Sequence, residues 1–107
     1  MTFLQNFRHH NVLRARNNFH HDTSEVWWTN AIAGEAGEAC NIAKKISRGD
    51  YKTLAELKDA HYALAIELAD VITYCDLLLA KLGVPTEDIL RDKFRIVSKR
   101  VGYEGTL

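Results

Sequence analysis

Two pairs of carboxylates interrupt the most apolar, alanine-rich parts of this sequence. Glu35 and Glu38 form the first pair, and Glu67 and Asp70 form the second. Residues at positions i and i+3 lie on one face of a helix. An isolated buried carboxylate is so unfavourable that such groups are paired, protonated or bound to metal. The spacing therefore predicts a helical fold in which four acids meet a cation, and oxygen-only ligands favour Mg²⁺ or Mn²⁺.

Apolar residues recur at helical spacing along most of the chain, with capping residues where the pattern starts and stops. Thr53-Leu-Ala-Glu56 is a capping box, and Gly83 is placed to end a helix. These signals predict an all-α, four-helix-bundle-like fold with one domain over residues 1–107. The first and last expected helices span residues 2–16 and 87–100. The second is capped by Thr23 or Ser24 and extends to about Ser47. The third begins at Thr53 and either runs unbroken to Leu82 or breaks between Asp59 and Tyr62.

The charge balance and the cysteines exclude several classes of protein. Lysine and arginine number 14, as do aspartate and glutamate, so no overall field recruits nucleic acid or an anionic membrane. The sequence contains no signal peptide and no apolar run of membrane-spanning length, which predicts a soluble cytoplasmic protein without such partners. Cys40 and Cys75 lack metal-site spacing, so free thiols are expected. The basic segments, residues 1–21 and 91–100, are either local anion contacts or solvated faces.

Two glycines stand beside the first acidic pair, inside a predicted helix. Gly34 and Gly37 each weaken a helix by about 1 kcal/mol relative to alanine. We therefore expect a neighbouring helix or a ligand to approach the backbone closely at these positions.

Three explanations of the carboxylates compete. A ferritin-like di-iron site requires Glu-x-x-His on two helices, and the sequence contains no such motif. A non-enzymatic interaction module, or a nucleotide-binding regulator, would carry its acids as ordinary helix charges. Magnesium-dependent cleavage of a phosphate compound would use the acids as metal ligands. It would also need cations near the phosphates and an aromatic wall for a base. The sequence offers Lys45, Lys93 and Arg100 as the cations, and Trp27, Trp28 and Tyr74 as the wall.

A longer pattern resembles a known family. It consists of Trp27-Trp28, Ala-Gly-Glu-Ala-Gly-Glu-Ala-Cys-Asn followed by Lys44-Lys45, Arg48-Gly49-Asp50, Glu67-Leu-Ala-Asp-Val-Ile-x-Tyr74, Leu82-Gly83, and Lys93-Phe94…Ser98…Arg100. This combination, which spans roughly Phe19 to Arg100, is similar to the MazG-like branch of the all-α nucleoside triphosphate pyrophosphatases, especially its short single-domain members.

The resemblance implies an enzyme that hydrolyses (deoxy)nucleoside triphosphates between the α and β phosphates. It assigns the Mg²⁺ ligands and catalytic carboxylates to Glu35, Glu38, Glu67 and Asp70. Candidate substrate contacts are Lys45, Lys93 and Arg100 for the triphosphate, Asn41 for orienting a ligand, and His20, Trp28 and Tyr74 for base and sugar. Members of the family are dimers or tetramers, so we expect a homodimer or homotetramer. Four helices of this size would otherwise expose much apolar surface.

Overall fold

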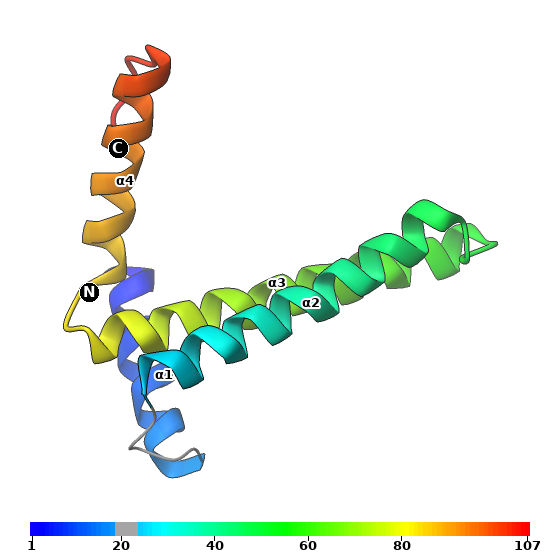
Figure 1. The fold of residues 1–107 in the computed structure, drawn as a ribbon, viewed down its shortest axis with the longest axis horizontal. Coiled ribbons are helices and arrows are strands. Elements are labelled where there is room, and N and C mark those ends of the chain that lie inside the picture. The colour runs from blue at the N-terminus through cyan, green and yellow to red at the C-terminus, as the bar shows by residue number, and fades with distance from the viewer. Residues whose placement is uncertain (19–23) are drawn as a thin grey trace. The chain divides into compact units, whose positions relative to one another are not determined.

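The computed structural model describes residues 1–18 and 24–107, and its regular elements are four helices (Figure 1). They are α1 (Phe3–Asn18), α2 (Glu25–Arg48), α3 (Leu54–Lys81) and α4 (Thr86–Val101). No strand occurs among the described residues, so the predicted all-α class is confirmed. The chain divides into two compact units. We call Asp22–Cys75 the hairpin unit, and Met1–His21 with Asp76–Leu107 the terminal unit.

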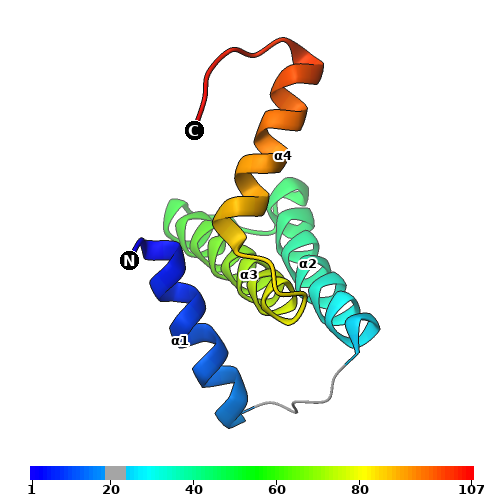
Figure 2. The same cartoon turned by 90° about the vertical axis from the view of Figure 1, so that its left-hand side faces the viewer.

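The hairpin unit consists of α2 and the greater part of α3, which lie side by side in both ribbon views (Figures 1 and 2). Ser24 begins α2, because its hydroxyl accepts a hydrogen bond from the backbone N–H of Trp27 at 3.2 Å. Gly49 ends α2 with φ of 80°, and its N–H donates to the Ile46 carbonyl. A short turn then returns the chain along α2.

The capping box at the start of α3 forms in a modified way. The Thr53 hydroxyl accepts a hydrogen bond from the backbone N–H of Glu56 at 3.1 Å, as predicted. The Glu56 carboxylate accepts from the backbone N–H of Lys52 at 3.2 Å. From here α3 runs without a break to Lys81, and Gly83 follows with φ of 74°. The sequence left open whether this helix is unbroken or breaks between Asp59 and Tyr62, and the unbroken helix is confirmed.

The terminal unit is organised around Asp76, whose side chain is almost fully buried near the end of α3. Its carboxylate accepts hydrogen bonds from Arg8 Nε at 3.0 Å, Asn11 Nδ2 at 3.1 Å and Thr86 Oγ1 at 2.5 Å. Arg8 also donates through Nη2 to the Val84 carbonyl and to Thr86 Oγ1, both at 2.8 Å. This network ties α1, the end of α3 and the start of α4 together, and it supplies the partners that a buried carboxylate requires.

The start of α4 differs from the prediction. The sequence predicts that this helix begins at residue 87, with Val84-Pro85-Thr86 as the turn and N-cap before it. The N-cap is Pro85, which makes no side-chain capping bond, and Thr86 is the first helical residue. The Thr86 hydroxyl instead donates to the Asp76 carboxylate and accepts from Arg8 Nη2, so both its donor and an acceptor position serve the buried ion pair.

Candidate functional site

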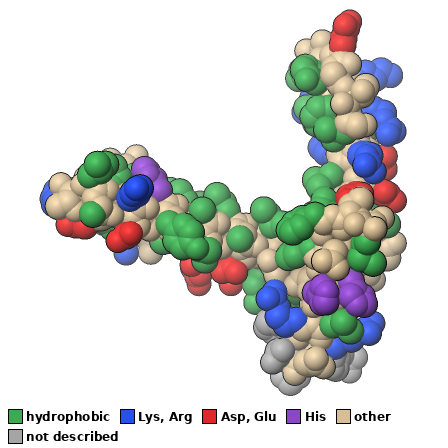
Figure 3. Space-filling model, turned by 180° about the vertical axis from the view of Figure 1, so that it is seen from behind, with side chains coloured by type: hydrophobic (Ala, Val, Ile, Leu, Met, Phe, Trp, Pro, Cys, Tyr) green, Lys and Arg blue, Asp and Glu red, His purple; other side chains and the backbone are tan. Residues whose placement is uncertain are grey.

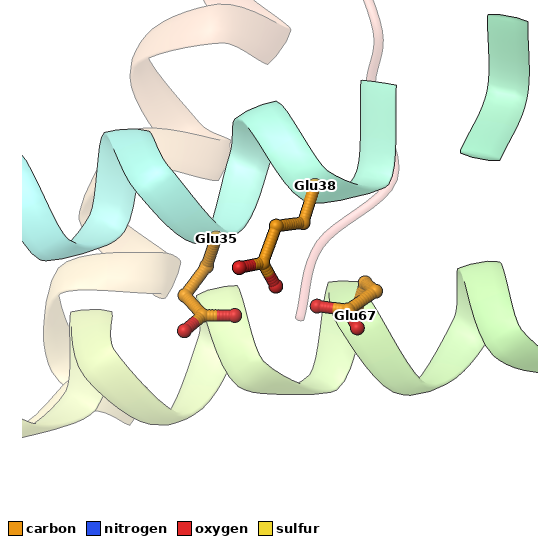
Figure 4. Close-up of side chains that lie close together, drawn as sticks. All are labelled: Glu35, Glu38 and Glu67. Atoms are coloured by element: carbon orange, nitrogen blue, oxygen red, sulfur yellow. The ribbon is translucent and has the colours of Figure 1, made fainter. Parts of the chain in front are cut away.

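Three carboxylates converge in the hairpin unit. Glu35 and Glu38 project from α2 toward Glu67 on α3 (Figure 4). One carboxylate oxygen from each residue lies within 4.8 Å of the other two. Glu35 and Glu67 are half-buried, whereas Glu38 is exposed. The i, i+3 spacing on α2 therefore does what the sequence predicted: it presents two acids to the facing helix.

The close approach of these acids perturbs their protonation. The pKa of Glu67 is raised to about 7, first by the hydrogen bond that it shares with Glu38, then by burial, and then by the charges of Glu38, Asp70 and Glu35. Burial, followed by the charges of Glu38 and Asp70, raises the pKa of Glu35 as well. Carboxylates this close cannot all ionise without cost, so a proton or a cation is favoured among them.

One oxygen of the cluster has no partner. Glu67 Oε2 is shielded from solvent and lacks a hydrogen bond to any described residue. Buried carboxylate oxygens are normally satisfied, so this atom has an unused capacity to accept a proton or bind a cation.

Asp70 lies one turn beyond Glu67 on α3 and is half-buried. Its charge raises the pKa values of Glu35 and Glu67, which places it within electrostatic range of the cluster. It does not belong to the group whose ligand atoms lie within 4.8 Å of one another, which in the described part of the chain contains the three glutamates.

The predicted aromatic residues lie together in the hairpin unit, and Trp28 is the one that belongs to its small core. Trp28 is 7% exposed and packs against Trp27 at 4.9 Å and Tyr74 at 5.9 Å between ring centroids. Tyr74 is half-buried, and its pKa is raised by burial and by the charges of Glu35, Asp70 and Glu38. Tyr74 therefore connects the tryptophan pair with the acidic cluster, while Trp27, at 43% exposure, is the more accessible indole.

A shallow hollow on α2 begins at Glu38 and continues over Asn41 and Lys44, with Gly34, Gly37 and Cys40 along it. Asn41 is exposed and Lys45 half-buried. Lys44, which is not among the predicted substrate contacts, also lines this hollow, and its i, i+3 spacing from Asn41 was the available signal. Among the described residues, no atom outside the local backbone of α2 lies within 4 Å of a Cβ built on Gly34 or Gly37, so no described helix occupies the space that the glycines leave.

The remaining predicted contacts lie elsewhere. Lys93 and Arg100 are exposed residues of α4, in the terminal unit. His20 lies outside the described residues. No described helix is both long enough and apolar enough to cross a membrane. No family model, curated protein or solved structure matches the chain.

Proposed function

We propose that this chain is a Mg²⁺-dependent, MazG-like nucleoside triphosphate pyrophosphohydrolase. It would convert (deoxy)nucleoside triphosphates to the monophosphate and pyrophosphate. The observation that carries the proposal is the convergence of Glu35, Glu38 and Glu67, with a buried Glu67 oxygen that has no hydrogen-bond partner among the described residues. An all-oxygen donor set of this kind suits Mg²⁺ or Mn²⁺ better than softer metals.

The residues present fit such an ion. Glu35, Glu38 and Glu67 would hold it, and Asp70, one turn from Glu67, is the proposed fourth ligand. When bound, a hard divalent cation activates water and offsets negative charge on phosphoryl oxygens. The elevated pKa of Glu67 means that near neutral pH this residue must lose a proton to act as a ligand.

The protein's own side chains would then bind and orient the triphosphate. Lys44 and Asn41 line the hollow that begins at Glu38, and Lys45 follows on the same helix, so a cationic and an amide group stand beside the acids. Trp28 is covered by its neighbours and is suited to support Tyr74 rather than to stack on a base. His20, Lys93 and Arg100 remain candidates for substrate contacts through the resemblance alone.

Incubation of the protein with a panel of dNTPs and NTPs and Mg²⁺ tests the proposal directly. We expect release of pyrophosphate and nucleoside monophosphate by the wild type, and a loss of at least ~100-fold in Glu38→Gln. Glu25→Gln is the matched control, because Glu25 is an exposed residue in the first turn of the same helix. Release of inorganic phosphate would reject cleavage between the α and β phosphates, and full activity in Glu38→Gln would reject the site.

We also propose that the protein works as a homodimer or homotetramer. The two units bury few apolar side chains below one tenth exposure, namely Trp28, Ala39, Ala60 and Leu77 among the described residues. Long helices with so little enclosed core are stabilised when a partner covers their remaining apolar faces.

A further inference from the structure

The side of α3 that faces away from the carboxylate cluster carries no charge over about three turns. Its residues, which we call the outer α3 face, are Tyr62, Ala65, Ile66, Leu68, Ala69 and Ile72. Tyr62, Ile66 and Ala69 form one row at intervals of four and three, and Ala65, Leu68 and Ile72 form the neighbouring row at intervals of three and four. The two rows together make one side of the helix. All six are exposed, and Figure 3 shows hydrophobic side chains following the α2–α3 pair. The charged residues between Tyr62 and Ile72 are Glu67, which belongs to the cluster on the α2 side, and Asp70, whose charge acts on that cluster.

The size of this face matches the apolar part of a dimer interface. Tyr62 is 70% exposed, Ile66 46%, Leu68 50% and Ile72 58%. With on the order of 200 Å² for each fully exposed large side chain, the four present roughly 450 Å² of mainly apolar surface. A stable interface buries about 800 Å² per partner, of which somewhat more than half is apolar. The outer α3 face is therefore large enough to form the centre of such an interface.

We infer that this face binds the same face of a second copy of the chain, with the two α3 helices antiparallel about a two-fold axis near Ala65 and Ala69. A two-fold interface brings identical surfaces together, so it is favoured by a face without charges that would repel their own copies. The two alanines allow close approach of the helices at the axis. Two α2–α3 pairs joined in this way would enclose an apolar core that one pair lacks.

This inference rests on the proposed homo-oligomer and identifies its interface. It also links assembly to the candidate site, because Glu67 and Asp70 belong to the same helix as the outer α3 face. Contact with a second copy would hold that helix in place, so the acids would be positioned by assembly as well as by α2.

Molar mass in solution tests the interface. The wild type should have at least twice its chain mass of 12.2 kDa at micromolar concentration. Leu68→Glu combined with Ile72→Glu should raise the dissociation constant by at least roughly 100-fold, since it buries unpaired charges in an apolar interface and brings position 68 close to its own copy near the axis. Leu54→Glu is the matched control, because Leu54 is 81% exposed on the same helix but lies outside the face. A wild type of 12.2 kDa, or an unchanged dissociation constant in the double variant, would overturn the inference.

Cysteine cross-linking provides a second test that does not depend on how the charged variant folds. In a Cys40→Ala, Cys75→Ala background, Ala65→Cys or Ala69→Cys should form a disulfide-linked dimer on mild oxidation, because equivalent residues near a two-fold axis approach each other. Leu54→Cys should not, because it lies roughly 20 Å along the helix from Ala69. Equal cross-linking at all three positions, or none at the alanines, would reject the face. Pyrophosphate release is measured separately. A dimer that releases no pyrophosphate would therefore reject the proposed enzymatic activity and leave the proposed interface in place.

Discussion

Replacement of Asp76 by asparagine removes the charge at the centre of the terminal unit while it keeps the side-chain volume. The carboxylate receives hydrogen bonds from Arg8, Asn11 and Thr86, and the Asp76 side chain is 2% exposed. Loss of one partner of a buried ion pair costs about 3–5 kcal/mol. Arg8 is 22% exposed and keeps its bond to the Val84 carbonyl, so the lower end of that range applies. We expect Asp76→Asn to lower the free energy of unfolding by about 3 kcal/mol, which corresponds to a fall in Tm of about 12 °C for a chain of this length.

Thermal and urea unfolding followed by circular dichroism measures this change. Asp50→Asn is the matched control, because the Arg48–Asp50 pair is shorter, at 2.6 Å, but both side chains are exposed. Exposed pairs contribute little, so the control should melt close to the wild type. Arg8→Met combined with Asp76→Leu should lose less stability than Asp76→Asn alone, because no uncompensated charge remains. A wild-type Tm in Asp76→Asn would refute the role assigned to the network.

Three further outcomes follow from the hairpin unit. Without divalent metal, the contribution of Glu67 to stability should be fully present below pH 4.5 and should be lost as pH rises through about 7, because the folded state holds a proton on Glu67 more tightly than the unfolded chain does. Melts in chelator between pH 5 and pH 7 measure this loss, and a rise in Tm over that range would contradict it. Trp28→Ala should lower the free energy of unfolding, measured in urea, by about 3–5 kcal/mol, because Trp28 is buried. Trp27→Ala should lower it much less, because Trp27 is 43% exposed. Gly37→Ala should raise the free energy of unfolding of the metal-free protein by about 0.5–1 kcal/mol, because no side chain of the described residues lies within 4 Å of the added methyl group. Destabilisation would show that the glycine is required for close approach.

Local chemistry explains which parts of the fold could be predicted from the sequence. Ser24, Thr53 and Gly49 each act within a few residues of themselves, through a hydroxyl that accepts a nearby N–H or through a left-handed φ. Such signals are contained in short stretches of sequence, so helix starts and ends follow from them. The pairing of Glu35 with Glu38 was predictable for the same reason.

The Asp76 network depends on residues distant in sequence, and no local pattern indicates it. Arg8 and Thr86 lie on either side of Asp76, at separations of 68 and 10 residues, and both meet it only after the chain folds. Thr86 illustrates the consequence: its sequence position suggests an N-cap, but its hydroxyl serves the carboxylate. The unsatisfied Glu67 oxygen and the elevated Glu67 pKa likewise depend on how α2 and α3 face each other.

Direct binding of a divalent cation tests the central claim that the glutamate cluster is a metal site. Isothermal titration calorimetry with Mg²⁺ or Mn²⁺, at pH 8 and pH 6, should show binding by the wild type that weakens at the lower pH, because the ion must displace a proton from Glu67. Glu67→Gln should abolish this binding, while Glu25→Gln should leave it unchanged. Absence of binding by the wild type at pH 8, or equal binding by Glu67→Gln, would contradict the account.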